Sequence, residues 1–169
     1  KEDRNTRQAV INIWRESPYA TNDIPCTISF QFLIREDKLH IIANMRSNDL
    51  WLGWPYDNFN FSILGAYVAL LLKDIYNIEV GLGITTINAG SRHLYEPNFE
   101  SADMCTHSNY EDYVNYKPLN LKDYSSAEDF LEHLEFVSLD KGEIEEMKVK
   151  ALDREYRKGF AHELFNETK

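Results

Sequence analysis

The sequence has few of the features that mark secreted, membrane or nucleic-acid-binding proteins. Its two cysteines, Cys26 and Cys105, are too few for a disulfide framework. It shows no signal peptide, and no run of about 20 apolar residues that would predict a membrane span. The chain has 18 Lys and Arg against 28 Asp and Glu, a net charge of −10. This charge argues against a nucleic-acid-binding surface, which needs a high density of positive charge to bind the phosphate backbone. These absences predict a protein of the reducing cytoplasm that binds neither membranes nor nucleic acid.

The first third of the chain has the composition of a sheet. With 43% hydrophobic residues, a chain of 169 residues can bury enough apolar surface to form one domain over residues 1–169. Residues 8–15 are β-branched and aromatic and predict a strand that ends at Ser17-Pro18. Apolar residues alternate in 26–35 and again in 39–43, which predicts a β-hairpin.

The middle of the chain predicts a helix followed by a strand. Residues 59–76 contain a nearly continuous apolar run, too apolar on all sides for a surface helix, so we expect a buried central helix. Asn58 or Asn60 would lie near its N-cap. Residues 79–95 return to strand character, interrupted by glycines. Strands and helices mixed in this order predict an α/β or α+β sheet protein.

The last part of the chain is acidic and predicts helices. Residues 126–129, Ser-Ala-Glu-Asp, resemble a capping box at the start of one helix. A second, polar amphipathic helix is predicted near 143–165. Residues 97–169 therefore form an acidic helical C-terminal region within the predicted single domain.

Cys26 is the first candidate for chemistry. It follows Pro25 at the start of a predicted strand, and the segment Arg46-Ser47 follows the next strand. A hairpin would return the arginine to the neighbourhood of the cysteine. A guanidinium group favours the thiolate form of a nearby cysteine and can bind a phosphate through two hydrogen bonds. The pair therefore predicts a nucleophile beside an anion site, although a cysteine considered alone is more often simply buried.

Four blocks of sequence, in order, resemble the thymidylate synthase superfamily, which includes the deoxycytidylate and cytidylate hydroxymethylases. The resemblance covers residues 6–96, and no match is found after residue 105. The blocks are Ile24-Pro25-Cys26 with Phe30-Gln31-Phe32, Arg46-Ser47-Asn48-Asp49-Leu50, Leu52-Gly53-Trp54-Pro55-Tyr56, and His93-Leu94-Tyr95. The resemblance implies a large twisted mixed sheet with helices on one face, dimerised through the sheets back to back.

The resemblance also implies roles in catalysis and phosphate binding. Cys26 would be the nucleophile that adds to C6 of a pyrimidine ring, so that C5 can attack the methylene carbon of methylenetetrahydrofolate. Arg46 and Ser47 would bind the phosphate of a pyrimidine nucleoside monophosphate. Arg7 would reach the phosphate of the partner subunit in a homodimer. Many members have a second arginine where this chain has Gln8, which would weaken that phosphate site.

The remaining implied contacts concern the base, the sugar and the folate. Gly53 would lie beside the base, His93 and Tyr95 at the sugar hydroxyl, and Asp49 near the folate pterin; no metal is implied. Each residue also has a structural alternative: Asp49 could cap a turn, His93 could be a satisfied histidine and Tyr95 could belong to the core. Three further residues, Cys105, Trp51 and Trp54, are read as core residues, with one tryptophan as a possible wall of the folate cavity.

Asp57 is the most informative departure from the family pattern. Thymidylate synthases typically have asparagine here, whose amide can both donate to and accept from uracil. A carboxyl group instead accepts from the 4-amino group of cytosine and, when protonated, can donate to N3. The cytosine hydroxymethylases resemble this chain in carrying Asp at this place. Asp57 therefore predicts 5-hydroxymethylation of dCMP or CMP, unless it merely caps the helix that begins near Asn58.

Two alternatives to a hydroxymethylase stay open. A thymidylate synthase that methylates dUMP would explain Cys26 but not Asp57. Family members carry an N-terminal part that this chain does not match, so either further residues precede Lys1, as its charged start without Met suggests, or the chain is naturally shortened. A shortened chain would bind a nucleotide without turnover.

Overall fold

The computed structural model describes residues 3–15, 24–107 and 119–138. The chain divides into two compact units, residues 1–127 and 128–169. The second unit contributes only the residues of helix α3 (Ala127–Ser138) after Ala127 to the described part. A single domain over residues 1–169 therefore stays a prediction.

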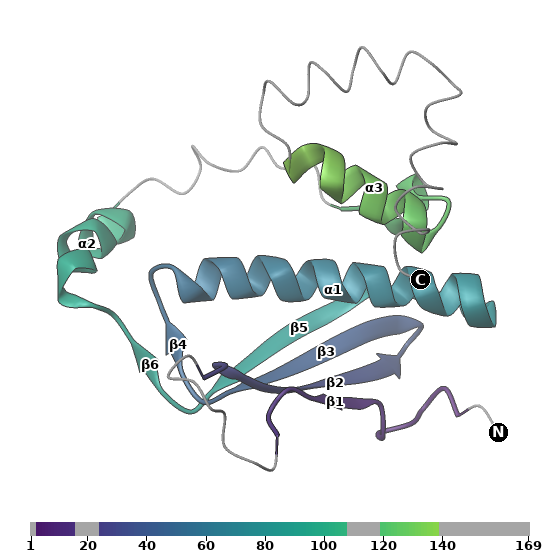
Figure 1. Ribbon diagram of the computed structural model, residues 1–169, viewed down its shortest axis with the longest axis horizontal. Coiled ribbons are helices and arrows are strands. Elements are labelled where there is room, and N and C mark those ends of the chain that lie inside the picture. The colour runs from purple at the N-terminus through teal and green to yellow at the C-terminus, as the bar shows by residue number, and fades with distance from the viewer. Residues whose placement is uncertain (1–2, 16–23, 108–118, 139–169) are drawn as a thin grey trace, which may run out of the picture. The chain divides into compact units, whose positions relative to one another are not determined.

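The first unit is built on a mixed four-stranded sheet in the order β1-β2-β3-β5 (Figure 1). The first two pairings are antiparallel and the pairing of β3 with β5 is parallel. The mixed sheet and its helix confirm the predicted α/β class. The strands are β1 (Val10–Asn12), β2 (Thr27–Arg35), β3 (Lys38–Met45) and β5 (Gly81–Ala89).

The predicted hairpin is formed by β2 and β3. Arg35 pairs with Lys38 across a turn of two residues, Glu36 and Asp37, which have φ values of 51° and 54°. Positive φ at both central residues gives a turn whose twist matches that of the flanking strands. The first strand is shorter than predicted, because only Val10–Asn12 pair with β2. Ser17 and Pro18 lie outside the described residues.

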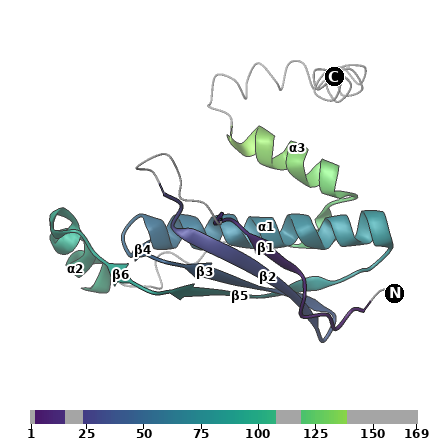
Figure 2. The same cartoon turned by 60° about the horizontal axis from the view of Figure 1, so that its bottom comes forward.

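Helix α1 (Gly53–Tyr76) connects β3 to its parallel neighbour β5 and contacts both strands (Figure 2). It begins at Gly53 rather than near residue 59, so the N-caps predicted at Asn58 and Asn60 are wrong. Gly65 allows close packing on the sheet, since a Cβ at this position would lie 2.6 Å from Cδ1 of Ile41. The core between helix and sheet includes Phe30, Phe32, Leu39, Ile41, Ala43, Met45, Phe61, Ala69, Val80 and Ile87.

Burial of α1 is greatest in its middle, where each of residues 61–72 is buried or half-buried. Phe61, Gly65 and Ala69 are buried, whereas Tyr56 and Phe59 are 66% and 61% exposed. The predicted burial of the helix is therefore met over residues 61–72, and the two ends of α1 are more exposed than predicted. By length and composition alone α1 would also pass as a membrane span, contrary to our expectation of none. The same properties fit a helix that covers a sheet, as this one does.

The segment after β5 changes direction at Gly90. A second sheet of two short parallel strands, β4 (Asn48–Asp49) and β6 (Arg92–His93), brings the residues after β3 beside those after β5. Two helical segments follow, η1 (Glu96–Asn98) and α2 (Phe99–His107). Cys105 is exposed on α2, so its predicted place in a helical core is wrong.

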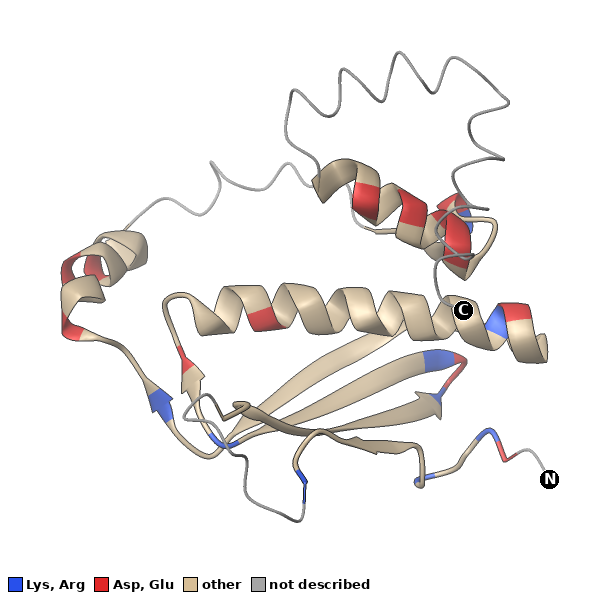
Figure 3. Ribbon diagram, in the orientation of Figure 1, with Lys and Arg blue, Asp and Glu red and all other residues tan. Residues whose placement is uncertain are grey.

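The acidic character of the later helices is visible in Figure 3, where α2 and α3 both contain acidic residues, coloured red. A short turn, η3 (Leu121–Asp123), precedes α3. The start of α3 at Ala127, directly after Ser126, agrees with the predicted capping box. The helix predicted near 143–165 lies outside the described residues.

Candidate functional site

Arg46 is held against the turn that carries Cys26. Its backbone N–H donates to the carbonyl oxygen of Cys26 at 2.9 Å, which extends the β2–β3 pairing by one bond. Its guanidinium group donates from Nε to the carbonyl oxygen of Pro25 at 3.2 Å and from Nη2 to that of Ile24 at 2.9 Å. Cys26 is exposed directly before β2. The hairpin therefore returns the arginine to the cysteine's turn, as its position after β3 predicted.

A second side chain, Trp14, also binds this turn. Its indole Nε1–H donates to the carbonyl oxygen of Pro25 at 3.0 Å. The oxygen of Pro25 thus accepts from both Trp14 and Arg46, using the two acceptor positions of a carbonyl group. The backbone before the thiol is fixed from two elements, which limits the positions that Cys26 can adopt.

The β4–β6 pair brings the predicted phosphate and sugar residues together. Ser47 precedes β4, and its Oγ lies 3.4 Å from Nδ1 of His93 on β6. The rings of His93 and Tyr95 meet edge to face, with centroids 4.8 Å apart. Tyr95 is 58% exposed, so its alternative place in the core is wrong. Ser47, His93 and Tyr95 therefore form one polar cluster after the parallel strands.

Asp49 closes the turn that leads into α1. Its Oδ1 accepts from the backbone N–H of Trp51 at 3.0 Å, and its Oδ2 accepts from Leu52 at 3.1 Å and Gly53 at 3.4 Å. The hydrogen bond from Trp51 is the largest cause that lowers the pKa of Asp49. Burial opposes it, and the hydrogen bonds from Leu52 and Gly53 and the nearby His93 add to the lowering. The capping alternative is thus present in the structure. A role in folate binding is a separate prediction.

Asp57 lies inside α1, one turn after its start, so it does not cap the helix. Its Oδ2 accepts a hydrogen bond from Nδ2 of Asn48 at 2.7 Å. Burial raises the pKa of Asp57, and the hydrogen bond from Asn48 opposes that shift without cancelling it. Gly53 lies beside the pair, because a Cβ there would be 3.5 Å from Nδ2 of Asn48 and 3.8 Å from Oδ2 of Asp57.

Arg7 is the predicted site residue that this fold places away from Cys26 of the same chain. Its carbonyl oxygen accepts from Nε2 of Gln31, and the neighbouring Ala9 accepts from the backbone of Phe32. Phe32 lies six residues along an extended strand from Cys26, a separation of roughly 20 Å. The exposed side chain of Arg7 is therefore far from the Cys26 of its own chain.

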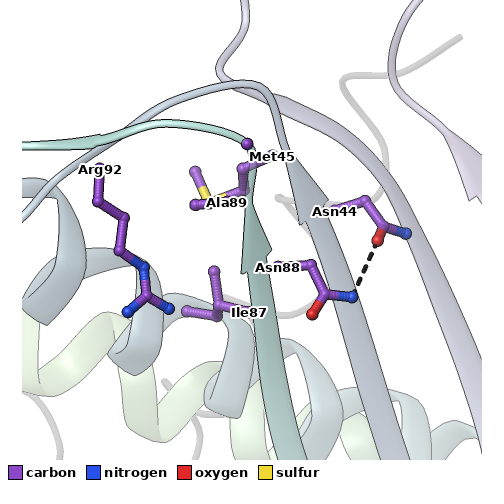
Figure 4. A pocket seen from close by; sticks show the side chains of 7 residues that line it. Asn44, Met45, Ile87, Asn88, Ala89 and Arg92 are labelled. Carbon is purple, nitrogen blue, oxygen red and sulfur yellow. Dashed lines mark hydrogen bonds between the residues drawn. The ribbon is translucent and has the colours of Figure 1, made fainter.

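A hollow of about 500 Å³ lies where β3 and β5 end, at the same end of the sheet as Cys26 (Figure 4). Asn88 donates to Asn44 and Asn44 donates to Ser29, each at 3.2 Å, so a ladder of polar groups crosses three strands beside it. The lining residues are Asn44, Met45, Ile87, Asn88, Ala89, Gly90 and Arg92.

Two residues of this region were missed by sequence reasoning. Asn48 lay within a motif block but received no role, and its contact with Asp57 depends on the unpredicted early start of α1. Arg92 lies with its guanidinium carbon 5.0 Å from the centroid of the Trp54 ring, a cation–π contact between β6 and α1. The sequence could have identified Arg92 as a site residue, because it directly precedes His93 of the last motif block. Within the described residues, no group of three His, Cys, Asp or Glu side chains could bind a metal.

Comparisons with known proteins match this arrangement to one family. The family model described as thymidylate synthase matches residues 1–150. The thymidylate synthase of Mycoplasma mobile is 32% identical over 122 residues, which cover 72% of this chain and 38% of that protein. The thymidylate synthase of Mycoplasma genitalium is 33% identical over 101 residues, which cover 59% of this chain and 33% of that protein.

A further relative and a solved structure agree. A putative thymidylate synthase of Methanothermobacter thermautotrophicus is 30% identical over 99 residues, which cover 58% of this chain and 42% of that protein. The structure of thermostable thymidylate synthase A from Bacillus subtilis superposes with a TM-score of 0.55 at 23% identity, over 63% of this chain and 36% of that chain. It shows the fold alone. This chain matches between 33% and 42% of the length of these relatives.

Proposed function

Since this chain belongs to the thymidylate synthase family, we propose that it carries part of a site for one-carbon transfer to a pyrimidine nucleotide. The donor is 5,10-methylenetetrahydrofolate and the acceptor is C5 of a nucleoside monophosphate. The preferred base is cytosine, in dCMP or CMP, and the product is its 5-hydroxymethyl derivative. The enzyme is thus a transferase of the cytoplasm, where an exposed thiol such as Cys26 stays reduced.

The state of Asp57 is the observation that carries the choice of base. Burial raises its pKa, so a carboxyl proton is more available there than on an exposed aspartate. A neutral carboxyl group can donate to N3 of cytosine from one oxygen and accept from the 4-amino group with the other. An ionised one facing O4 of uracil would be repelled. Mismatched buried polar groups cost about 1–3 kcal/mol, which corresponds to tenfold to over a hundredfold discrimination.

Cys26 supplies the nucleophile in this proposal. Its thiolate adds to C6 of the ring, the C5–C6 double bond opens, and C5 becomes a carbanion-like centre that attacks the one-carbon unit. Loss of the C5 proton and of the folate leaves an exocyclic methylene group on C5. Addition of water gives hydroxymethyl, whereas hydride from the folate gives methyl, and release of Cys26 restores the ring. Arg46, fixed beside the cysteine's turn, contributes positive charge for the nucleotide phosphate together with Ser47.

The geometry of Arg7 supports a homodimer. Its side chain is exposed and lies far along β2 from its own Cys26, so it is free to reach the phosphate of a second chain. Gly53 borders the base beside Asp57, and His93 and Tyr95 bind the sugar hydroxyl. Asp49 contacts the folate. Its oxygens accept three backbone hydrogen bonds out of about four lone-pair positions, which leaves one acceptor position.

The experiment is release of tritium from C5-labelled dCMP, CMP and dUMP in the presence of methylenetetrahydrofolate. We expect release from a cytosine nucleotide, and its complete loss in Cys26→Ala. The matched control is Cys105→Ala, which removes the other exposed thiol and should leave release unchanged. Release from only one of dCMP and CMP would identify the sugar.

Two other functions predict different results. The names of the relatives favour methylation of dUMP, and release from dUMP alone with formation of dihydrofolate would establish it. The second is a non-catalytic nucleotide-binding module. Binding of a nucleotide with no exchange at C5 would establish that function and overturn catalysis by this chain.

A further inference from the structure

The amide of Asn48 is the most deeply buried polar side chain beside Asp57. Only 2% of Asn48 is exposed. Its Nδ2 donates to Oδ2 of Asp57 at 2.7 Å and lies 3.6 Å from Sδ of Met45. Its Oδ1 is buried and has no hydrogen-bond partner among the residues described. Burying an unpaired amide oxygen costs free energy, so a residue that only filled space would be apolar here.

The backbone of Asn48 is fixed on both sides. Its N–H donates to the carbonyl oxygen of Ser91 at 2.9 Å, and its β4 position pairs with Arg92 on β6. The following residue, Asp49, is held by the three backbone bonds at the start of α1. The amide therefore points at Asp57 from a rigid strand, and Asp57 is presented from a helix.

The polarity of this hydrogen bond constrains the carboxyl group. An amide NH2 can only donate, so the oxygen that faces it, Oδ2 of Asp57, must accept. A proton on Asp57 is thereby directed to the other oxygen, Oδ1. An accepting oxygen has two lone pairs, so Oδ2 can accept a second hydrogen bond from a ligand.

We propose that Asn48 is a positioning residue that makes the Asp57 carboxyl group read cytosine and reject uracil. This inference rests on the proposed function. A neutral carboxyl group alone is ambiguous, because it can offer its O–H to N3 of cytosine or, after rotation, to O4 of uracil. Asn48 holds Oδ2 as the acceptor for the 4-amino group and leaves the O–H on Oδ1 for N3. Rotation would place the O–H against the amide NH2, which the bond polarity disfavours.

The first test measures the carboxyl pKa of Asp57 by carbon-13 NMR, which requires no ligand and no catalysis. In Asn48→Ala we expect a higher pKa than in the natural protein, because the lost hydrogen bond favours the charged form. In Asn48→Asp, which keeps the side chain's size, the second carboxyl should raise it further. Asn5→Ala and Asn5→Asp are the matched controls, since Asn5 is exposed and its neighbour Arg4 binds Asp37 in the hairpin turn, at the opposite end of β3 from Asn48. Neither should move the titration.

The second test compares the dissociation constants of dCMP and dUMP in the same four variants. We expect Asn48→Ala to reduce the preference for dCMP by about tenfold and the Asn5 variants to leave it unchanged. If both Asn48 variants leave the Asp57 titration and the preference for dCMP unchanged, the inference about Asn48 is overturned. The proposed function would still stand in that case, provided that the natural protein prefers dCMP. A preference for dUMP in the natural protein would overturn the proposed function itself, and with it the cytosine orientation assigned here.

Discussion

Asp49 and Asp57 stand on either side of the first turn of α1, yet the fold treats them in opposite ways. Asp49 accepts from three backbone N–H groups, which lower its pKa. Asp57 accepts from one side-chain amide and is partly buried, and burial raises its pKa. The same side chain therefore begins a helix at one position and, at the other, is left with an oxygen that makes no hydrogen bond within the described residues.

The difference teaches where to look for ligand-binding groups. A carboxylate whose oxygens are used by the backbone contributes mainly to the local structure. Burying a carboxyl group costs free energy, and at Asp57 the single hydrogen bond does not offset that cost. Groups of this kind are frequent at functional sites. By this criterion Asp57 is the better candidate for binding a base, and Asp49 is first a structural residue.

The largest expected effect is the loss of base preference in Asp57→Asn. An amide can present its NH2 to O4 of uracil, so we expect the ratio of dCMP to dUMP binding to shift toward dUMP by tenfold to over a hundredfold. The measurement is the pair of dissociation constants by calorimetry. Asp49→Asn makes the same chemical change at the other carboxyl group. An equal shift of the ratio in both variants would break the distinction between them.

The next effect concerns Gly53, which lies between the two carboxyl groups. In Gly53→Ala the new methyl group would lie 3.3 Å from Cβ of Asp49 and 3.5 Å from Nδ2 of Asn48. Small shifts relieve these contacts, and alanine favours a helix, so the melting temperature should change little. We expect dCMP binding to weaken by about tenfold, because the methyl group takes space beside the base-reading pair. Unchanged binding would show that the base lies elsewhere.

A moderate loss of stability is expected for Asp49→Asn. The amide keeps one acceptor oxygen and places an NH2 group against backbone donors, so we expect the melting temperature at pH 7 to fall by roughly 5 °C. The folded-state pKa of Asp49 is lowered, so its stabilisation is present above the unfolded pKa of about 3.9 and is lost as pH falls through the folded pKa. Melting curves of both proteins should therefore converge in acid. A constant difference at all pH values would mean that charge plays no part.

The sequence predicted the elements whose signal is local. Alternating apolar residues in 26–35 and 39–43 specified the hairpin, and the hairpin alone was enough to bring Arg46 to the turn of Cys26. Ser126 marked the start of α3. In each case the pattern and the structural consequence lie within a few residues of each other, so no distant contact had to be known.

The errors occurred where the hydrophobic pattern does not decide the structure. The start of α1 at Gly53 depends on Asp49, whose side chain caps the turn from the preceding strand, whereas the apolar run pointed to a start near Asn58. Sequence reasoning therefore could not place Asp57 inside the helix or pair it with Asn48. Cys105 is exposed because α2 has no buried residue in the described part of the chain, which the helix's own sequence does not reveal.

The smallest expected effect is a gain of stability in Asp57→Asn, and its sign is opposite to that of Asp49→Asn. The folded-state pKa of Asp57 is raised, so between the unfolded and folded pKa values the native state binds more protons than the unfolded chain. Stability therefore falls as pH rises through that window, and the cost is present at pH values above it. Removing the charge should raise the melting temperature there by roughly 1–3 °C, with no gain below about pH 3.5. A loss of stability at pH 7 would mean that the charged hydrogen bond with Asn48 outweighs the burial of the carboxylate, and would make the two aspartates alike.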